Sequence, residues 1–167
     1  MSNGSLSIEH IRDFVEQHEG RRNKVYNDSA GHPTIGVGFN LDRDGAQEEI
    51  EALGLNYQDV RNGKVSLTDV QIDTLFHADV NSAVNSARNV ISNFDDIPGD
   101  KQIVLADMAF NLGEAGLAGF HKMVAAVENE DWATAADEME DSRWFKQVGD
   151  RGTADSDMMR EDPTSGS

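Results

Sequence analysis

Residues 19–41 read EGRRNKVYNDSAGHPTIGVGFNL, and this stretch decides the fold. Its first residue ends a predicted helix over 7–19, in which apolar residues recur at spacings of three and four. Ser7 is a suitable N-cap for that helix. Gly20 follows directly, at the position where a glycine commonly ends a helix in the left-handed conformation. The stretch therefore opens with a well-defined helix end.

The remainder of the stretch has the pattern of β structure. A short extended segment at 25–26 leads into the turn sequence DSAGHP at 28–33. The run TIGVGFNL at 34–41 alternates strictly, which predicts one strand with two unlike faces. Glycines would strip one face of side chains and let a ligand approach the backbone, although a bend or bulge would use them equally well. The apolar face holds Ile35, Val37, Phe39 and Leu41, and the other face holds Thr34, Gly36, Gly38 and Asn40.

The rest of the chain is predicted to be helical. A short helix is expected over 47–53, then a loop through Gly63, then a long helix over 68–91 that starts with a Thr68–Gln71 capping box. Further helices are expected over 98–111, 117–128, 132–142 and 150–160, with Asp131 capping the third of these. One small β region among many helices indicates an α+β, mostly helical fold.

Composition excludes several classes of function. The 167 residues include 31 acidic and 14 basic side chains, a formal net charge of −17 with neutral histidines. This charge opposes binding to the nucleic acid backbone and to anionic membranes, so neither nucleic acid nor membrane insertion is expected. There is no cysteine, the histidines lack metal-ligand spacing, and no nucleotide-binding motif occurs, so we expect neither a metal nor a cofactor. The opening MSNGSLSIEH has no basic or apolar region typical of a secretory signal.

Glu19 is a candidate general acid on local grounds. It continues the apolar stripe of the first helix, and it stands at the helix C-terminus, where the macrodipole disfavours negative charge. Desolvation and the dipole both favour the protonated carboxyl that a general acid requires. An ordinary, partly exposed Glu paired with an arginine fits the local pattern as well.

Asp28 and Thr34 gain meaning from their spacing to Glu19. Alone, Asp28 fits an Asx turn, and Thr34 is simply the first residue of the alternating run. Together, Glu19, eight residues, Asp28, five residues and Thr34 within TIGVG resemble the active-site segment of the phage-type lysozymes, the muramidases of glycoside hydrolase family 24. MAFNLGEAGLAGF at 108–120 is similar to that family's helical signature, and Trp132 with SRWFKQVGDR at 142–151 is similar to its C-terminal signature. Three separate motifs in the family's order are more specific than the triad alone.

The resemblance implies a single lysozyme domain over 1–161. Its β-containing lobe would span about 20–65, a connecting helix about 68–91, and a helical lobe about 92–161 together with the first helix, with a saccharide cleft between the lobes. Residues 162–167 would form a flexible tail.

The resemblance also implies a reaction. The chain would hydrolyse the β-1,4 bond between N-acetylmuramic acid and N-acetylglucosamine in bacterial peptidoglycan by inversion, for which two carboxylates typically stand roughly 6.5–9.5 Å apart. Glu19 would protonate the glycosidic oxygen, while Asp28 and Thr34 would hold the attacking water. Expected substrate contacts are Asn40, Phe110 and Asn111, and Arg151 stands in the place of a family arginine that approaches the catalytic Glu. The protein would act as a monomer, made in the cytoplasm without a signal peptide and released to the wall by a separate system.

Two features depart from the family pattern. The family often has a histidine after its glycine pair, which can pair with an aspartate on the long helix; here Phe39 stands in that place and Asp79 remains. Asp79 must therefore find another donor or be exposed. The net charge is the second departure, because many family members are basic and an anionic wall should repel this chain.

Rival functions fall in other classes. A wall-binding module without turnover would not need the Glu19–Asp28–Thr34 set. An acidic inhibitor or nucleic-acid mimic would need its carboxylates arrayed on one surface, whereas here they are spread over several helices. A muramidase remains the leading hypothesis, either as a lytic endolysin or as a lysozyme domain carried by a phage particle or a secretion machine.

Overall fold

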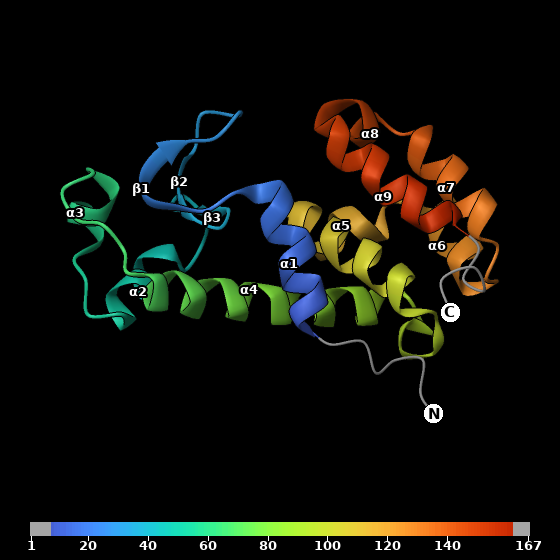
Figure 1. Ribbon diagram of the computed structural model, residues 1–167, viewed down its shortest axis with the longest axis horizontal. Coiled ribbons are helices and arrows are strands. Elements are labelled where there is room, and N and C mark those ends of the chain that lie inside the picture. Colours follow the sequence, from blue (N-terminus) through green and yellow to red (C-terminus); the bar gives the residue numbers. More distant parts are fainter. Residues whose placement is uncertain (1–7, 162–167) are drawn as a thin grey trace. The chain divides into compact units, whose positions relative to one another are not determined.

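The computed structural model describes residues 8–161. Figure 1 traces the elements from blue to red along the chain. The fold is α+β and mostly helical, as predicted. The predicted Ser7 cap and the predicted tail over 162–167 lie outside the described residues. The elements are α1 (Ile8–Glu19), β1 (Arg22–Asn27), β2 (Pro33–Gly36), β3 (Phe39–Asn40), α2 (Ala46–Ala52), α3 (Tyr57–Arg61), α4 (Asp69–Val90), the 3₁₀ turn η1 (Phe94–Asp96), α5 (Gly99–Ala118), α6 (His121–Glu128), α7 (Trp132–Glu140), α8 (Arg143–Val148) and α9 (Asp150–Arg160).

Two compact units make up the described chain, which divides after Val15 and again after Asp79. We call residues 16–79 the sheet unit and the described residues on either side of it the helical unit. Both divisions fall inside helices, α1 and α4.

The sheet unit contains an antiparallel sheet in the order β1-β2-β3. The predicted single strand over 34–41 is wrong, because β2 and β3 form a hairpin in which Thr34 lies opposite Asn40. Gly36 and Gly38 have φ angles of +65° and +67° and make the turn between them. Directly opposed residues in an antiparallel pair share a face, so the hairpin preserves the alternation that a single strand would have.

Local capping signals are realised in the backbone. Thr68 and Gln71 bond reciprocally, with the Thr68 N–H donating to Gln71 Oε1 at 2.9 Å and the Gln71 N–H donating to Thr68 Oγ1 at 3.2 Å. Asp131 accepts from the Thr134 N–H and caps α7 as predicted. Gly20 has a φ of +79° at the end of α1.

Two short helices were not predicted. The loop expected before Gly63 contains α3, whose N-cap Asn56 accepts from the Asp59 N–H. Helix α8 lies between the two last predicted helices, with Ser142 as its N-cap. Each has fewer than two turns, which is too short for a helical periodicity to be recognised.

The helical unit is built on α5, in which residues 101–109 are almost entirely buried while much of its C-terminal part is exposed. The predicted helix over 98–111 continues to Ala118 through a break at Gly113 (φ 78°, ψ 169°). Helix α9 packs against α5, α7 and α8, and α6 packs against α7 (Figure 1). Within residues 8–161 no single helix is both long and apolar enough to cross a membrane, although α5 and α6, bent by 104° at their junction, meet those criteria as a pair.

Candidate functional site

Glu19 is the last residue of α1 and belongs to the sheet unit. Its side chain is half-buried, and its carboxylate lies against the turn between β2 and β3. A Cβ atom placed on Gly38 with ideal geometry would lie 2.7 Å from Glu19 Oε1. The helix end thus brings the predicted acid to the hairpin that carries Thr34.

Asp28 opens the loop between β1 and β2. Its Oδ1 accepts hydrogen bonds from the backbone N–H groups of Ala30 at 2.9 Å and His32 at 2.8 Å. The loop is closed by backbone bonds from the Asp28 N–H to His32 O and from the Gly31 N–H to Asp28 O. The Asx turn anticipated from the sequence is therefore present, and it fixes the direction of the carboxylate. Both recorded bonds use Oδ1, which leaves Oδ2 as the oxygen that could accept from a water.

Thr34 is buried and held in place. Only 3% of it is exposed, and its hydroxyl donates to His32 O at 3.0 Å. It lies opposite Tyr26 on β1 and opposite Asn40 on β3. The three side chains consequently form a row across one face of the sheet. Asn40 Oδ1 accepts from the Asp42 N–H at 2.8 Å, which orients the amide.

Tyr26 is a site candidate that the sequence analysis missed. Burial raises the pKa of its phenol, the negative charges of Glu19 and Asp28 raise it further, and Arg22 lowers it. The Arg22 guanidinium lies 4.7 Å from the centre of the Tyr26 ring. One phenol is thus within electrostatic reach of both predicted carboxylates. Its position could have indicated this, because Tyr26 lies two residues before Asp28 near the end of an extended segment.

Asp79 has found a donor other than a histidine. Arg43 binds it with two hydrogen bonds, Nη2 to Oδ1 at 2.8 Å and Nη1 to Oδ2 at 3.0 Å, and also reaches Glu49 at 2.8 Å. The same guanidinium lies 4.0 Å from the centre of the Phe39 ring. Two residues therefore do what one histidine could do: the Phe39 ring provides the packing, and the Arg43 guanidinium provides the positive charge and the hydrogen bonds to Asp79.

The other predicted residues belong to the helical unit. Phe110 packs against its core, and Asn111 is exposed. Asn111 Oδ1 accepts from Trp144 Nε1 at 2.9 Å, which leaves the amide N–H₂ as the group available to a ligand. Arg151 is buried and binds Asp107 bidentately, with bonds of 3.0 and 2.7 Å.

Asp155 adds a second carboxyl to that buried cluster. It is fully buried, and within the described part of the chain no donor reaches either of its oxygens. Burial, and then the adjacent Asp107 charge, raise the pKa of Asp155 well above its ordinary range, against the lowering effect of Arg151. Since the group facing it is another carboxyl, a protonated Asp155 would be able to donate a hydrogen bond to Asp107.

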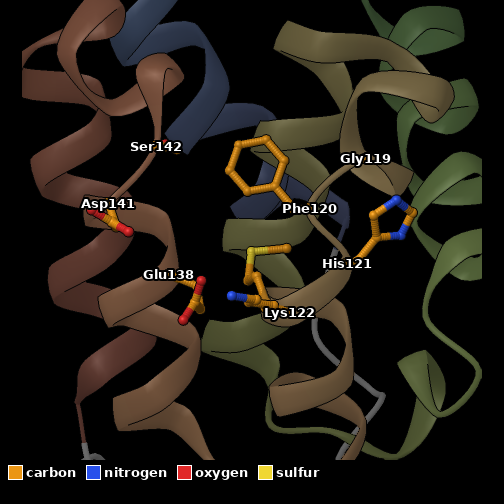
Figure 2. A pocket seen from close by; sticks show the side chains of 8 residues that line it. Gly119, Phe120, His121, Lys122, Glu138, Asp141 and Ser142 are labelled. Carbon is orange, nitrogen blue, oxygen red and sulfur yellow. The ribbon is translucent and has the colours of Figure 1, made fainter.

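Figure 2 shows a pocket of about 370 Å³ within the helical unit. It lies between the start of α6 and the α7–α8 junction, with the Lys122 amine turned toward Glu138. None of the predicted site residues lines it. The lining consists of Gly119, Phe120, His121, Lys122, Met123, Glu138, Asp141 and Ser142.

A sequence comparison decides the family. Residues 16–156 match the sequence model described as phage lysozyme. The chain belongs to the phage lysozyme family. It is a lysozyme, a hydrolase of the muramidase type that acts on peptidoglycan.

Named relatives agree with this assignment. The lysozyme is 26% identical over 152 residues to probable T4-type lysozyme 2 of Dictyostelium discoideum, covering 86% of this chain and 89% of the relative. Probable T4-type lysozyme 1 of the same organism is also 26% identical, over 158 residues, with the same coverage. The pre-baseplate central spike protein Gp5 of Enterobacteria phage T4 is 30% identical over 150 residues, which cover 86% of this chain but 26% of that longer protein.

In this lysozyme the predicted residues divide between the units. Glu19, Asp28, Thr34 and Asn40 all lie in the sheet unit, and the last three share one antiparallel hairpin system. Phe110, Asn111 and Arg151 lie in the helical unit. In residues 8–161 no group of three or more His, Asp or Glu side chains is arranged to hold a metal ion.

Proposed function

We propose that this lysozyme cleaves the β-1,4 bond between N-acetylmuramic acid and N-acetylglucosamine with inversion at the anomeric carbon. Glu19 acts as the general acid, and Asp28 and Thr34 position the attacking water. The observation that carries the proposal is geometric: the Glu19 carboxyl group lies against Gly38 of the β2–β3 hairpin that carries Thr34, and Asp28 opens the loop that leads into the same hairpin.

Rigid placement supports the roles of Asp28 and Thr34. Two backbone N–H groups donate to Asp28 Oδ1 and fix the carboxylate. Asp28 Oδ2 can then accept a hydrogen bond from a water molecule and so orient the oxygen lone pair of that water toward the sugar. The Thr34 hydroxyl donates to His32 O, so its oxygen lone pairs are the part left to accept from the same water. Both side chains pay little conformational entropy when substrate arrives, because the loop has already ordered them.

Two carboxyl groups are needed because the two proton transfers occur on opposite faces of the sugar. Glu19 protonates the departing glycosidic oxygen, and Asp28 accepts the proton of the incoming water. Asn40 and Asn111 are proposed as hydrogen-bonding contacts to the saccharide and Phe110 as an apolar one. Arg151, held by Asp107 in the helical unit, is proposed to support the acid, as the resemblance to the family implies. Monomeric action and release from the cytoplasm by a separate system stay predictions.

The acid is tested with Glu19→Gln, measured as clearing of purified peptidoglycan. The amide is nearly isosteric but cannot donate the proton, so turnover should fall about 10²–10⁴-fold or more while the melting temperature is kept. Glu16→Gln is the matched control, one turn earlier on α1 and paired with Arg21 at 3.5 Å, and it should retain activity. A folded Glu19→Gln protein with most of the wild-type activity would contradict the role. If the protein were instead a wall-binding module without turnover, the wild type itself would not clear the peptidoglycan.

Asp28→Asn tests whether the negative charge of Asp28, rather than its hydrogen bonds within the loop, is needed for turnover. The asparagine Oδ1 can still accept from the Ala30 and His32 N–H groups, so the loop should keep its shape. Loss of the carboxylate charge should nevertheless lower turnover, because an amide is a poor base.

The stereochemical outcome tests how Asp28 acts. Inversion of a β-linked substrate releases the α anomer first, which proton NMR detects before mutarotation. If the β anomer appears first, Asp28 is acting as a covalent nucleophile and the water-positioning role is wrong.

A further inference from the structure

Gly38 lies in the turn between β2 and β3, directly against the proposed acid. A Cβ atom at this position would lie 2.7 Å from Glu19 Oε1, 3.0 Å from Cδ and 3.3 Å from Cγ. Real Cβ atoms essentially never approach another heavy atom closer than 3.0 Å. The Glu19 carboxyl group therefore occupies space that any side chain at position 38 would fill.

Gly36, the last residue of β2, flanks the same turn and provides an internal comparison. Its φ of +65° matches the +67° of Gly38, so both positions favour glycine for the same backbone reason. The three heavy atoms nearest to a Cβ atom on Gly36 would all belong to the Ile72 side chain, at 3.4 to 3.9 Å, which is ordinary van der Waals contact. The positive φ angle explains why glycine is favoured at both positions, but only at Gly38 would a Cβ atom collide with the Glu19 carboxyl group.

The turn cannot easily yield to an added methyl group. Val37 and Phe39, on either side of Gly38, are 2% and 1% exposed, and their burial anchors the turn. Glu19 is half-buried and has several rotatable bonds. The carboxyl group is consequently the part that would move.

We propose that Gly38 is a positioning residue for the lysozyme reaction: by lacking a side chain, it provides the seat that holds the Glu19 carboxyl group at the glycosidic oxygen. This inference rests on the proposed role of Glu19 as the acid. Reacting groups must be held within a fraction of an ångström, since a misplacement of about 1 Å can lower the rate about 10²-fold.

The test compares Gly38→Ala with Gly36→Ala on soluble peptidoglycan fragments. Both variants carry the same positive-φ strain, so their melting temperatures should fall by similar amounts. Gly38→Ala should lower kcat about 10²-fold with KM little changed, whereas Gly36→Ala should keep most of the wild-type kcat. Equal kcat losses in the two variants, or a loss confined to KM, would overturn the inference.

A second comparison covers the case in which Gly38→Ala does not fold. Asn tolerates the left-handed conformation better than other non-glycine residues and places its Cβ atom in the same position, so Gly38→Asn carries the same test. Either substitution is also made in a Glu19→Asp background, where the shorter side chain draws the carboxyl group away from the added Cβ atom. In the Glu19→Asp background, the substitution at position 38 should lower kcat only a few-fold further. A further loss as large as that in the wild-type background would overturn the proposed positioning role of Gly38.

The two proposals fail in distinguishable ways. An active Glu19→Gln enzyme removes the basis of both. An inactive Glu19→Gln enzyme beside a fully active, folded Gly38→Ala enzyme removes only the role of Gly38.

Discussion

Arg43→Met should weaken the sheet unit far more than its partly exposed position suggests. Arg43 makes two hydrogen bonds to Asp79 and one to Glu49, and it lies over the Phe39 ring. The Asp79 side chain is only 13% exposed. Removing the guanidinium leaves a mostly buried carboxylate without its cation, while the methionine keeps contact with the ring.

The expected cost follows from these exposures. Loss of one partner from a fully buried ion pair costs about 3–5 kcal/mol. Arg43 is 31% exposed, so solvent screening reduces the Coulomb part, and the total loss should be about 2–3 kcal/mol including the cation–π contact. For a chain of this size such a loss corresponds to a melting temperature lower by about 5–10 °C.

The loss should depend on pH. Burial raises the pKa of Asp79, and Arg43 opposes that rise. Without Arg43 the folded-state pKa moves further above the unfolded-state value. The variant then retains stability below the unfolded pKa and loses it as pH rises through the folded pKa, so the deficit should be larger at pH 7 than at pH 4.

Urea unfolding followed by circular dichroism at these two pH values measures the effect. Arg61→Met is the matched control, because Arg61 pairs with Asp42 where both side chains are more than 30% exposed, and it should cost much less stability than Arg43→Met. Adding Phe39→His to Arg43→Met should recover part of the loss by offering Asp79 an imidazole. The reasoning is refuted if the two methionine variants lose equal stability, or if the deficit of Arg43→Met does not grow with pH.

Two further predictions concern charge. Asp155→Asn should gain stability over the wild type as pH rises from 4 toward 7, because the raised pKa of Asp155 makes the wild type lose stability over that interval and an amide does not ionise; parallel pH profiles in thermal denaturation would contradict this. Clearing of intact walls should increase from about 10 mM salt toward about 0.15 M, because screening weakens repulsion between an anionic wall and a chain of net charge −17. A neutral chito-oligosaccharide, if cleaved, should respond less, and a steady decline of wall clearing while the fold stays intact would show that the charge does not act as a barrier.

The sequence alone determined what depends on near neighbours. The end of α1 at Gly20, the Thr68–Gln71 capping box and the Asp131 cap each involve residues within four positions, so propensity and spacing are sufficient to predict them. The segment proposed to hold the active site was recognisable for a similar reason, because Glu19, Asp28 and Thr34 fall within sixteen residues at a fixed spacing. The alternation over 34–41 was read correctly as two unlike faces but wrongly as one strand.

Tertiary structure decided the rest. A two-residue turn preserves the alternation of side chains, so only the pairing of Thr34 with Asn40 distinguishes a hairpin from a strand. Arg43 meets Asp79 across 36 positions, and Arg151 meets Asp107 across 44. Gly38 comes against Glu19 only after the hairpin has folded back to the end of α1. Contacts of this kind arise from burial and chain reversal rather than from local preference, and no pattern within one stretch of the sequence encodes which distant side chain will be the partner.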